Sequence, residues 1–370
     1  MTLSAIEMNA PIVSDACESY TGPIEVVMPF YERDICFVRL FARGIRRYMD
    51  KNTFRAIHFV WVSTLPLPKS ELDEITLNLG ASEVVVTVST MPLQDQRQGW
   101  NKQQEAKLNA AFDVATPYYV AFDTKNIPIS SFGREIFFAP DNKARSAGYS
   151  TLDELTLPDR GWLEKSNLLV AENRVPGHAR VGKCHTPFMF HTETTRRLVR
   201  LVNSKYGTLA NAINRGASEF AMYDIYIRDP HQTRSLDCHH SLMIERSRSA
   251  KVVWRNTPNA VDVMHDISNQ IAEGKNFDFS FFGVHRLWTR RDSKHVAPLA
   301  REIFIQRKIL GEDEQWFSKE MCEAAGKSAV ESKVEGSKSG TENYDDELID
   351  PESDWFGEWM PSFPELKDMS

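Results

Sequence analysis

The stretch YYVAFDTKNIPI (residues 118–129) runs from apolar residues straight into Asp123, Lys125 and Asn126. Two acids separated by one residue at such a strand end often hold a divalent metal, which neutralises the phosphate oxygens of a ligand. Here Lys125 occupies the position of the second acid. Its ammonium group would supply part of that positive charge directly. Asp123 would then bind a sugar or ribose hydroxyl, or hold a metal weakly. The alternative is a strand end with Lys125 in solvent.

A second polar set lies in GWNKQQEAKLNAAF (residues 99–112). Helical spacing places Trp100, Gln103 and Lys107 on one face. We expect Lys107 to reach a phosphate and either Gln103 or Gln104 to bind a hydroxyl. The alternative is that Trp100 belongs to the core and Lys107 to the surface.

A candidate general base lies in ASEFAMYDIYI (residues 217–227). A hydroxyl that acts as a nucleophile needs a carboxylate to take its proton. Glu219 and Asp224 are the two candidates for this carboxylate. The alternative is that Ser218 and Glu219 cap and charge the amino end of a helix.

The triplet Cys238, His239 and His240 contains metal-ligand residue types. Adjacent histidines in a strand point to opposite faces, and no second ligand pair stands at zinc spacing. The five cysteines are scattered and odd in number, which predicts reduced thiols in a cytosol. We therefore expect no zinc site at this triplet.

Several enzyme classes lose support because their motifs are missing from the sequence. There is no Walker A motif, no Gly-x-Gly-x-x-Gly, no Gly-x-Ser-x-Gly and no His-Glu-x-x-His. A net charge of -7 argues against a general nucleic-acid binder.

The elements that position these residues follow from hydrophobic periodicity. In the first half, apolar runs and helical patterns alternate, which predicts a parallel α/β sheet whose ligands lie beyond the carboxyl ends of the strands. The expected strands are 24–30, 56–63, 83–88 and 118–123, and the expected helices are 35–50, 70–80 and 101–115. In the second half the expected helices are 161–174, 192–207, 217–229 and 297–310, and the expected strands are 183–191, 250–256 and 277–285.

The carboxyl-terminal region differs in composition from the rest. Residues 331–370 hold 12 acids and 3 bases, which leaves the remainder of the chain close to neutral. From about residue 326 the chain is rich in Ser, Gly, Glu and Asp, which predicts a disordered acidic tail. Aromatic residues return in 354–366. That motif either packs back onto the domain or docks a protein partner.

No signal peptide and no run of about 18 apolar residues are visible, so we expect a cytoplasmic protein without a transmembrane segment. Any membrane-bound substrate would be met at the inner-membrane surface.

The motifs also carry a family resemblance. GWNKQQEAKLNAAFDVATPYYVAFDTKNIPI, TPFMFHTETTRRLVRLVN and SEFAMYDIYI occur in the same order as in a bacterial group of GT-A-like glycosyltransferases, the DUF6492 type. The resemblance covers roughly residues 24–310. Its largest departure is Lys125, which replaces the second acid of the family's Asp-x-Asp.

The resemblance implies a GT-A-like fold with a mainly parallel sheet flanked by helices. The implied layout is a flexible leader (1–22), one glycosyltransferase domain (23–312) and the acidic tail (326–370). Within the domain, residues 23–130 would form the nucleotide-binding half and 131–312 the acceptor half. The implied activity moves a sugar from a nucleotide-sugar donor to the hydroxyl of a glycan or other acceptor, in bacterial surface polysaccharide synthesis.

The resemblance makes Glu219, which stands in the family's Ser-Glu pair, the first candidate for the base and Asp224 the second. It also implies roles for residues outside the three motifs. The end of the first strand would contact the base and ribose of the donor through Pro29, Tyr31 and Asp34. His285 and Arg286 would face the donor phosphates. The cofactor of such enzymes is Mn²⁺ or Mg²⁺, for which Asp123 and His285 are the candidate ligands. Lys125 argues against that metal.

Two other functions remain open. One is a catalytically inactive scaffold that acts through its tail, and the other is a module that binds a sugar or nucleotide without transfer. Convergence of Asp123, Lys107, Glu219 and His285 on one pocket would favour an active site over a scaffold.

Overall fold

The computed structural model describes residues 20–80, 84–92, 99–145, 149–150, 157–171, 181–182, 186–229, 239–241, 250–253, 257, 259–284 and 293–314. The expected leader, except for its last three residues, and the whole expected tail lie outside this part of the chain. His285 and Arg286 also lie outside it.

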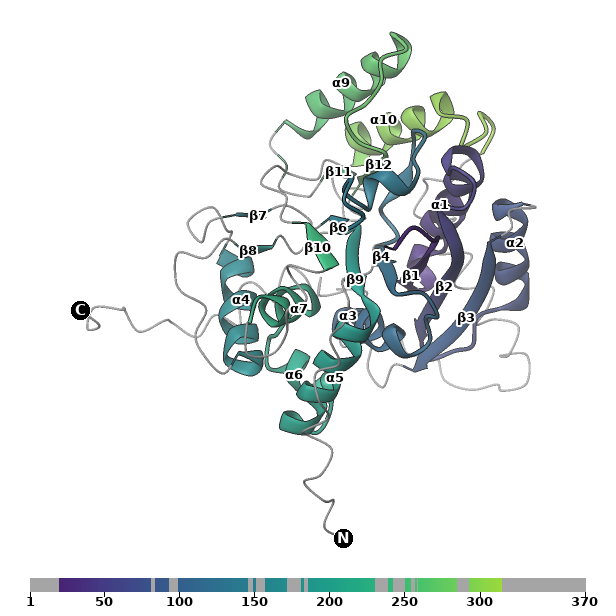
Figure 1. Cartoon of the computed structure of the whole chain (residues 1–370). Coiled ribbons are helices and arrows are strands. Elements are labelled where there is room, and N and C mark those ends of the chain that lie inside the picture. Colours follow the sequence, from purple (N-terminus) through teal and green to yellow (C-terminus); the bar gives the residue numbers. More distant parts are fainter. Residues whose placement is uncertain are drawn as a thin grey trace.

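A five-stranded sheet forms the centre of the fold, in the order β3-β2-β1-β4-β9 (Figure 1). Four of its strands are parallel, and β9 runs antiparallel to β4. The strands are β1 (Ile24–Phe30), β2 (Phe54–Ser63), β3 (Val85–Pro92), β4 (Tyr118–Ala121) and β9 (Phe188–His191). The fold is therefore a mixed α/β architecture with a mainly parallel sheet, as the sequence predicts.

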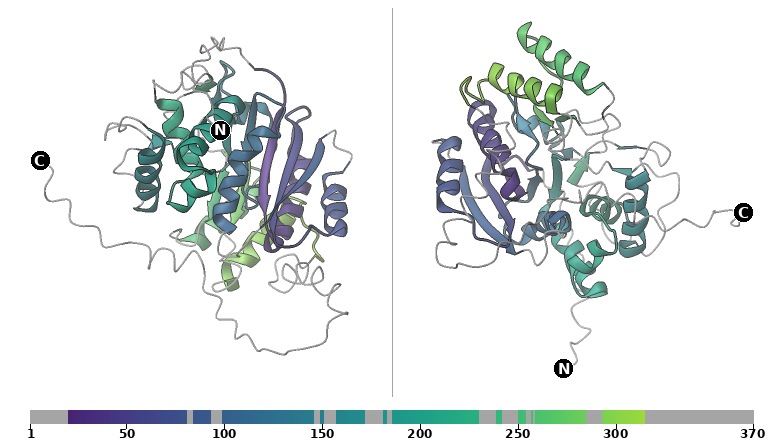
Figure 2. Two further views of the ribbon diagram at one scale, coloured as in Figure 1. Left: turned by 90° about the horizontal axis from the view of Figure 1, so that it is seen from below. Right: turned by 180° about the vertical axis from the view of Figure 1, so that it is seen from behind.

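Helices cover both faces of this sheet (Figure 2). Residues 26 and 28 of β1 pack into one core, with α1 (Ile35–Tyr48) and α2 (Lys69–Leu79). Residue 27 and its neighbours on β4 pack into the other core. That core includes α3 (Gly99–Asn109), α5 (Thr192–Tyr206), α6 (Leu209–Asn214) and α7 (Glu219–Arg228). Burial on both faces explains why the central strands are nearly unbroken apolar runs.

A second sheet joins the two halves of the chain. It has the order β11-β12-β5, with β11 and β12 parallel and β5 antiparallel to β12. Its elements are β11 (Ala250–Val253), β12 (Phe281–Val284) and β5 (Ile127–Pro128), packed with α9 (Ala260–Ala272) and α10 (Ser293–Gln306). Since β5 follows the Asp123 turn at once, this sheet fixes the chain just beyond that turn.

The remaining elements are short or lie at the side of the domain. Helix α4 (Leu157–Val170) contacts α7. Two short strand pairs are formed by β6 (Ala144–Arg145) with β10 (His240–Ser241) and by β7 (Tyr149–Ser150) with β8 (Val181–Gly182). The described residues also include three 3-10 turns (Glu32–Asp34, Ala110–Phe112, Arg134–Ile136).

Four sequence-based expectations about structure need correction. The expected strand 277–285 begins only at Phe281. Within the described part of the expected strand 183–191, residues 186–187 precede β9, which begins at Phe188. Helix α9 was not predicted, although its residues are amphipathic. Cys36 is disulfide-bonded, which contradicts the expectation of reduced thiols, and the other four cysteines lie outside the described residues. In the described part of the chain, every helix is too short or too polar to cross a membrane.

A buried histidine cluster lies at the end of β9 that is remote from Asp123. His191 stacks on His239 with ring centroids 3.7 Å apart, and Tyr223 Oη lies 2.6 Å from His240 Nε2. Tyr223 Oη also accepts the backbone N–H of His191 at 2.8 Å. His239 and His240 thus take part in packing and hydrogen bonding within this cluster, while Cys238 lies outside the described residues. Burial is the main cause that lowers the pKa of His191 to about 2 and that of His240 to about 3.

These lowered pKa values predict a loss of stability in mild acid. Between pH 6.5 and about 3 the unfolded chain binds protons at His191 and His240 that the folded chain does not. The free energy of unfolding should therefore fall as the pH drops, by about 1.4 kcal/mol per pH unit for each histidine. Urea unfolding at pH 7.5, 6.0 and 5.0 measures this fall.

A matched control separates the buried histidines from the rest of the chain. His240→Gln should flatten the dependence on pH between 6.5 and 4.5, whereas His265→Asn, at an exposed position of α9, should leave it unchanged. Carboxylates contribute mainly below this window. Equal slopes in the wild type and His240→Gln would contradict the assignment.

Candidate functional site

The candidate site is built around the ammonium group of Lys107. This residue lies on α3 and is 4% exposed. Its Nζ is 2.8 Å from Asp123 Oδ1 and 3.1 Å from Glu219 Oε1, and lies 4.8 Å from the centre of the Phe220 ring. Lys107 therefore ties together a helix, a strand end and a second helix that are far apart in the sequence.

Asp123 sits in a tight polar turn just after β4. The backbone N–H of Asp123 donates to Asn126 Oδ1 at 3.1 Å. In return, the backbone N–H of Asn126 donates to the backbone carbonyl of Asp123 at 3.0 Å. Asn126 is fully buried and donates its side-chain N–H to the carbonyl of Thr186 at 3.2 Å. The amide of Asn126 thus shapes the turn rather than facing a ligand.

Both carboxylate oxygens of Asp123 already have partners. Oδ1 accepts from Lys107, whereas Oδ2 is 3.0 Å from Lys125 Nζ and accepts from Thr186 Oγ1 at 2.9 Å. Asp123 and Lys125 are partly exposed, with 24% and 20% of their side-chain surfaces accessible. The two lysines therefore flank one carboxylate, and Lys125 lies on the accessible side.

Glu219 holds Lys107 from α7. It is 3% exposed. One of its oxygens contacts Lys107 and the other accepts from Ser218 Oγ at 3.1 Å, while its backbone N–H donates to Gln104 Oε1 at 3.2 Å. Ser218 does not cap the helix through its side chain. With both oxygens bonded and buried, Glu219 is placed to orient Lys107.

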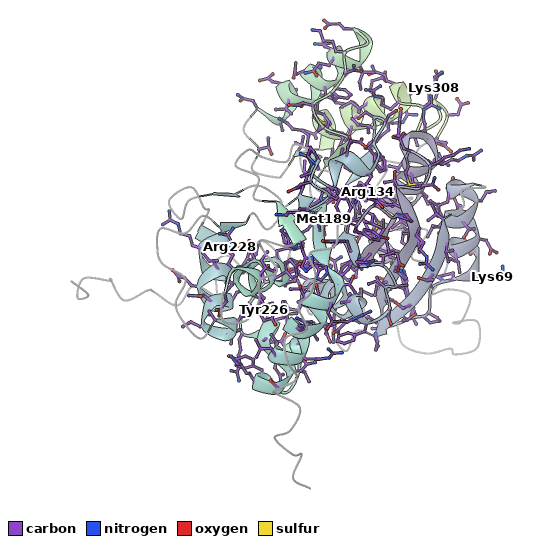
Figure 3. All side chains as sticks on the ribbon, in the orientation of Figure 1. Lys69, Arg134, Met189, Tyr226, Arg228 and Lys308 are labelled. Atoms are coloured by element: carbon purple, nitrogen blue, oxygen red, sulfur yellow. The ribbon has the colours of Figure 1, made fainter. Side chains whose placement is uncertain are left out.

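Asp224 does not join this cluster. It lies about 140° around α7 from Glu219 at 100° per residue and is 3.0 Å from Nε of Arg228, which is labelled in Figure 3. The sequence-based choice of Asp224 as second candidate for the base therefore lacks geometric support.

Charge pairing keeps Asp123 and Lys107 ionised. Burial opposes the charged form of Asp123, but Lys107 and Lys125 outweigh it and hold its pKa well below the ordinary value. Burial likewise opposes the charge of Lys107, but Asp123 and Glu219 raise its pKa above the ordinary value. Asp123 and Lys107 therefore both remain charged at neutral pH.

The described residues of this cluster do not fit a divalent cation. A metal bound to Asp123 would lie against the ammonium groups of Lys107 and Lys125, which already occupy both oxygens. In the described part of the chain, no three His, Cys, Asp or Glu side chains gather in a metal-binding group. The candidate ligand His285 lies outside that part.

Two of the other expected donor contacts, Tyr31 and Asp34, lie in the loop after β1, where Tyr31 packs against the amino end of α3. Tyr31, half-buried, packs so closely on Gly99 that a Cβ there would lie 2.7 Å from Tyr31 Oη. Asp34 accepts the backbone N–H of Tyr31 at 3.3 Å. Asp34 is buried, so it shapes the loop.

Three further residues were expected to contact the donor. Pro29 is buried within β1. Trp100 is half-buried and stacks on Trp162 of α4 with ring centroids 5.4 Å apart. Gln103 is half-buried. Trp162 was not selected from the sequence, because only the fold brings α4 to α3.

Gly283 is a supporting residue that the sequence did not indicate. A methyl group built at this position of β12 would overlap the backbone carbonyl oxygen of Lys125. The turn that carries Asp123 and Lys125 therefore rests directly on β12. The signal in the sequence is the lone glycine within an aromatic strand.

We expect Gly283→Ala to displace this turn. Overpacking against backbone should lower the free energy of unfolding by about 1–3 kcal/mol, as measured by urea unfolding. Gly161→Ala is the matched control, because a Cβ at that helical position meets no atom within 4 Å. It should leave stability unchanged or raise it by about 0.5–1 kcal/mol. A Gly283→Ala protein as stable as the wild type would contradict the close contact.

Residues 23–268 match a family described as a family of unknown function, DUF6492. The chain belongs to this family. The match confirms, at the level of the family, the resemblance drawn from the motifs. Among solved structures, the DUF6492 chain is similar to the apo structure of the bifunctional glycosyltransferase WbbM. The two are 12% identical, and the match covers 55% of this chain and 39% of that chain, with a TM-score of 0.33. No curated protein matches.

Proposed function

We propose that this protein is a GT-A-like glycosyltransferase that moves a sugar from a nucleotide-sugar donor to an acceptor hydroxyl. The observation that carries the proposal is the pair of lysines around Asp123 at the carboxyl end of β4. Ligands of parallel α/β sheets bind at this edge. A partly exposed, ion-paired lysine there matches the negative charge of a phosphate group.

In this proposal Lys125 supplies the positive charge that stabilises the departing nucleotide phosphate. Asp123 holds the Lys125 ammonium in place, and Lys107 fixes Asp123 from the buried side. Tyr31 would stack on the base, and Gln103 would bind a hydroxyl of the donor. Such preorganised charge is most effective where little water can enter. Since the described residues do not fit Mn²⁺ or Mg²⁺, no step depends on a metal.

Glu219 has a supporting role in this mechanism. Deprotonation of the acceptor needs a carboxylate that the acceptor hydroxyl can reach. Both oxygens of Glu219 are bonded within the protein, so we assign Glu219 to the orientation of Lys107. His285 and Arg286 remain candidates for contact with the phosphates.

A donor panel tests the proposal. UDP-, CMP- and GDP-sugars are added to the full chain, and the melting temperature is measured with EDTA and with Mn²⁺ or Mg²⁺. A ligand that binds only the folded state at 100 times its Kd stabilises it by about 2.7 kcal/mol. Mass spectrometry of the same mixtures detects transfer or hydrolysis. Absence of any shift across all donors would overturn the proposal.

A module that binds a sugar or nucleotide without transfer is the second candidate. Binding of a donor without product would favour this module. The third candidate function, an inactive scaffold that acts through its tail, has less support for the following reason. Asp123, Lys107 and Glu219, three of the four residues expected to converge, lie in one hydrogen-bonded cluster.

A further inference from the structure

Three side chains form a hydrogen-bonded line across β1, β2 and β3, away from the Asp123 cluster. Glu25 Oε2 lies 2.6 Å from His58 Nε2, and His58 Nδ1 lies 2.7 Å from Thr87 Oγ1. Both carboxylate oxygens of Glu25 also accept the backbone N–H of Ala115 at 3.2 Å. Glu25 is buried, His58 half-buried and Thr87 exposed. The line therefore runs from a buried acid to an accessible hydroxyl.

The charge of Glu25 decides which nitrogen of His58 carries the proton. Burial opposes ionisation of Glu25, but hydrogen bonds from His58 and Ala115 outweigh it and lower its pKa. Ionised Glu25 can only accept, so His58 Nε2 carries the hydrogen in the neutral ring. Nδ1 then has a free lone pair for the proton of Thr87. This is the order of acid, imidazole and hydroxyl that activates a nucleophile.

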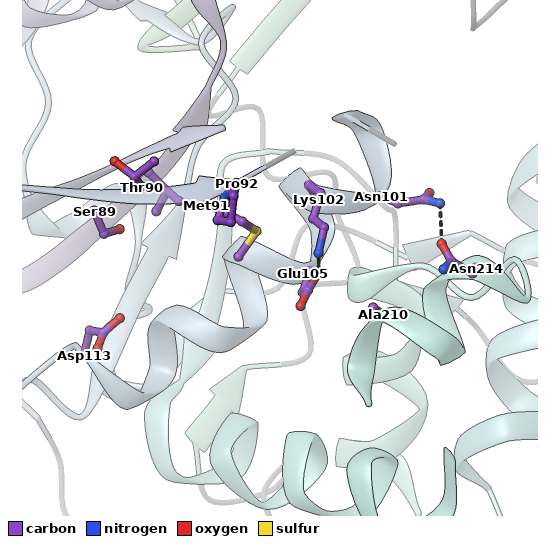
Figure 4. Close-up of a pocket in the computed structure, with 11 residues that line it drawn as sticks. Ser89, Thr90, Met91, Pro92, Asn101, Lys102, Glu105, Asp113, Ala210 and Asn214 are labelled. Atoms are coloured by element: carbon purple, nitrogen blue, oxygen red, sulfur yellow. Dashed lines mark hydrogen bonds and ion pairs between the residues drawn. The ribbon is translucent and has the colours of Figure 1, made fainter. Parts of the chain in front are cut away.

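A groove of about 620 Å³ lies on the same face of the sheet (Figure 4). The groove is lined by Val60 of β2 and Ser89 of β3. Val60 stands two positions after His58, and Ser89 two positions after Thr87. Because residues two apart in a strand share a face, all four side chains lie on the same face of the sheet. Asp113, another lining residue, stands two positions before Ala115. Thr87 itself does not line the groove, but it stands two positions before Ser89 on the same face of β3 and so borders the groove.

The groove is separate from the candidate site for the sugar donor. Its wall includes Lys102 and Glu105, which form an ion pair on α3 at 2.7 Å, whereas Lys107 points from the same helix into the Asp123 cluster. Asn101 and Asn214, hydrogen-bonded to each other at 2.8 Å, also line the groove. Figure 4 shows these two pairs side by side across α3 and α6.

We propose that Thr87 is a nucleophile that takes an acyl group from an activated ester bound in this groove. Thr87 Oγ1 forms a bond to the carbonyl carbon of the ester while its proton passes to His58 Nδ1. The bond from that carbon to the leaving oxygen then breaks, and His58 Nδ1 returns the proton to the leaving alcohol. An acyl-threonine ester remains, and His58 is back in its starting tautomer. Glu25 acts through His58 as a positioning residue.

Labelling of the full chain with p-nitrophenyl acetate tests the proposal. Peptide mass spectrometry measures the acetylation rate of Thr87 and of Lys102 in the same molecules. Lys102 serves as an internal standard because it lines the groove that Thr87 borders. We expect an acetyl group on Thr87. His58→Gln should lower the rate at Thr87 about 10²-fold relative to Lys102, the usual contribution of a general base.

Two further variants separate activation from folding. Thr87→Val at this exposed position should abolish the label without a change in melting temperature. Ser89→Ala is a control, because Ser89 is paired on β2 with Val60, whereas Thr87 is paired with His58. This variant should leave labelling of Thr87 unchanged. Glu25→Gln should lower the ratio of Thr87 to Lys102 labelling, which a loss of packing alone would not do. The proposal fails if Thr87 stays unlabelled, or if His58→Gln is labelled at the wild-type ratio.

Discussion

Replacement of Lys107 by methionine should lower the free energy of unfolding by about 3–5 kcal/mol. Methionine keeps much of the apolar stem but leaves Asp123 and Glu219 facing each other without the cation between them. Removing one partner from a buried ion pair costs this much because an uncompensated charge stays behind. The buried position of the ammonium group, with carboxylates at 2.8 and 3.1 Å, makes this the largest stability effect that we expect. Urea unfolding at pH 7.5 measures it.

The same helix offers a matched control. Lys102 forms an ion pair with Glu105, but the two side chains are 22% and 17% exposed, and pairs near solvent contribute only about 0–1 kcal/mol. Lys102→Met should therefore change stability little. Adding Glu219→Gln to Lys107→Met should restore part of the loss, because it removes one of the unpaired charges. A loss below about 1 kcal/mol in Lys107→Met would show that the cluster is not closed as described.

Replacement of Lys125 by alanine should weaken binding of a nucleotide-sugar by about ten- to a hundredfold and leave stability nearly unchanged. A hydrogen bond to a charged group contributes about 1.5–3 kcal/mol, which corresponds to that range. The Lys125 side chain is partly exposed, so its ion pair with Asp123 adds little to folding. Calorimetric titration with a donor found in the panel measures the affinity.

The chain contains a close control for this change. Asp141 and Lys143 repeat the Asp-x-Lys spacing in an exposed position, with their charged atoms 3.9 Å apart. Lys143→Ala should leave donor affinity unchanged. An unchanged affinity in Lys125→Ala would show that Lys125 does not contact the donor phosphates.

Lys125→Asp asks whether the lysine stands in for a metal. The new acid would remove one of the two cations at Asp123 and supply a second oxygen ligand. We expect this variant to bind the donor only when Mn²⁺ is added, whereas the wild type binds it in EDTA. Equal donor binding by the variant with and without Mn²⁺ would contradict the idea that the ammonium group replaces the ion.

The main features of the sheet were predictable from the sequence. The strands that begin at Ile24 and Tyr118 are largely apolar, with Glu25 as the one charged residue of the first, because both faces of the central sheet are covered. That pattern is local, so it can be recognised before the fold is known. The carboxyl edge of the sheet could be located for the same reason, and with it the position of Asp123 at that edge. The direction of β9 was not predictable, because strand pairing depends on residues distant in the sequence.

The partners within the site depended on tertiary structure. The sequence selected Lys107, Asp123 and Glu219 separately, but it did not indicate that one ammonium group joins both carboxylates. It also gave Glu219 the role of a base, since exposure of a carboxylate cannot be judged from a helical pattern. Burial and the bond from Ser218 decide that role.

The sequence by itself determined that a lysine stands two residues after Asp123, where a second acid would complete a metal site. Only the tertiary structure decided what this lysine does to the carboxylate. It places the partly exposed Lys125 at one carboxylate oxygen and the buried Lys107 at the other, while Gly283 leaves room for the turn. The physical reason is that the spacing along the chain fixes which groups are available. The packing of distant strands and helices then decides which of these charged groups come within about 3 Å of one another, and so decides the charge balance of the site.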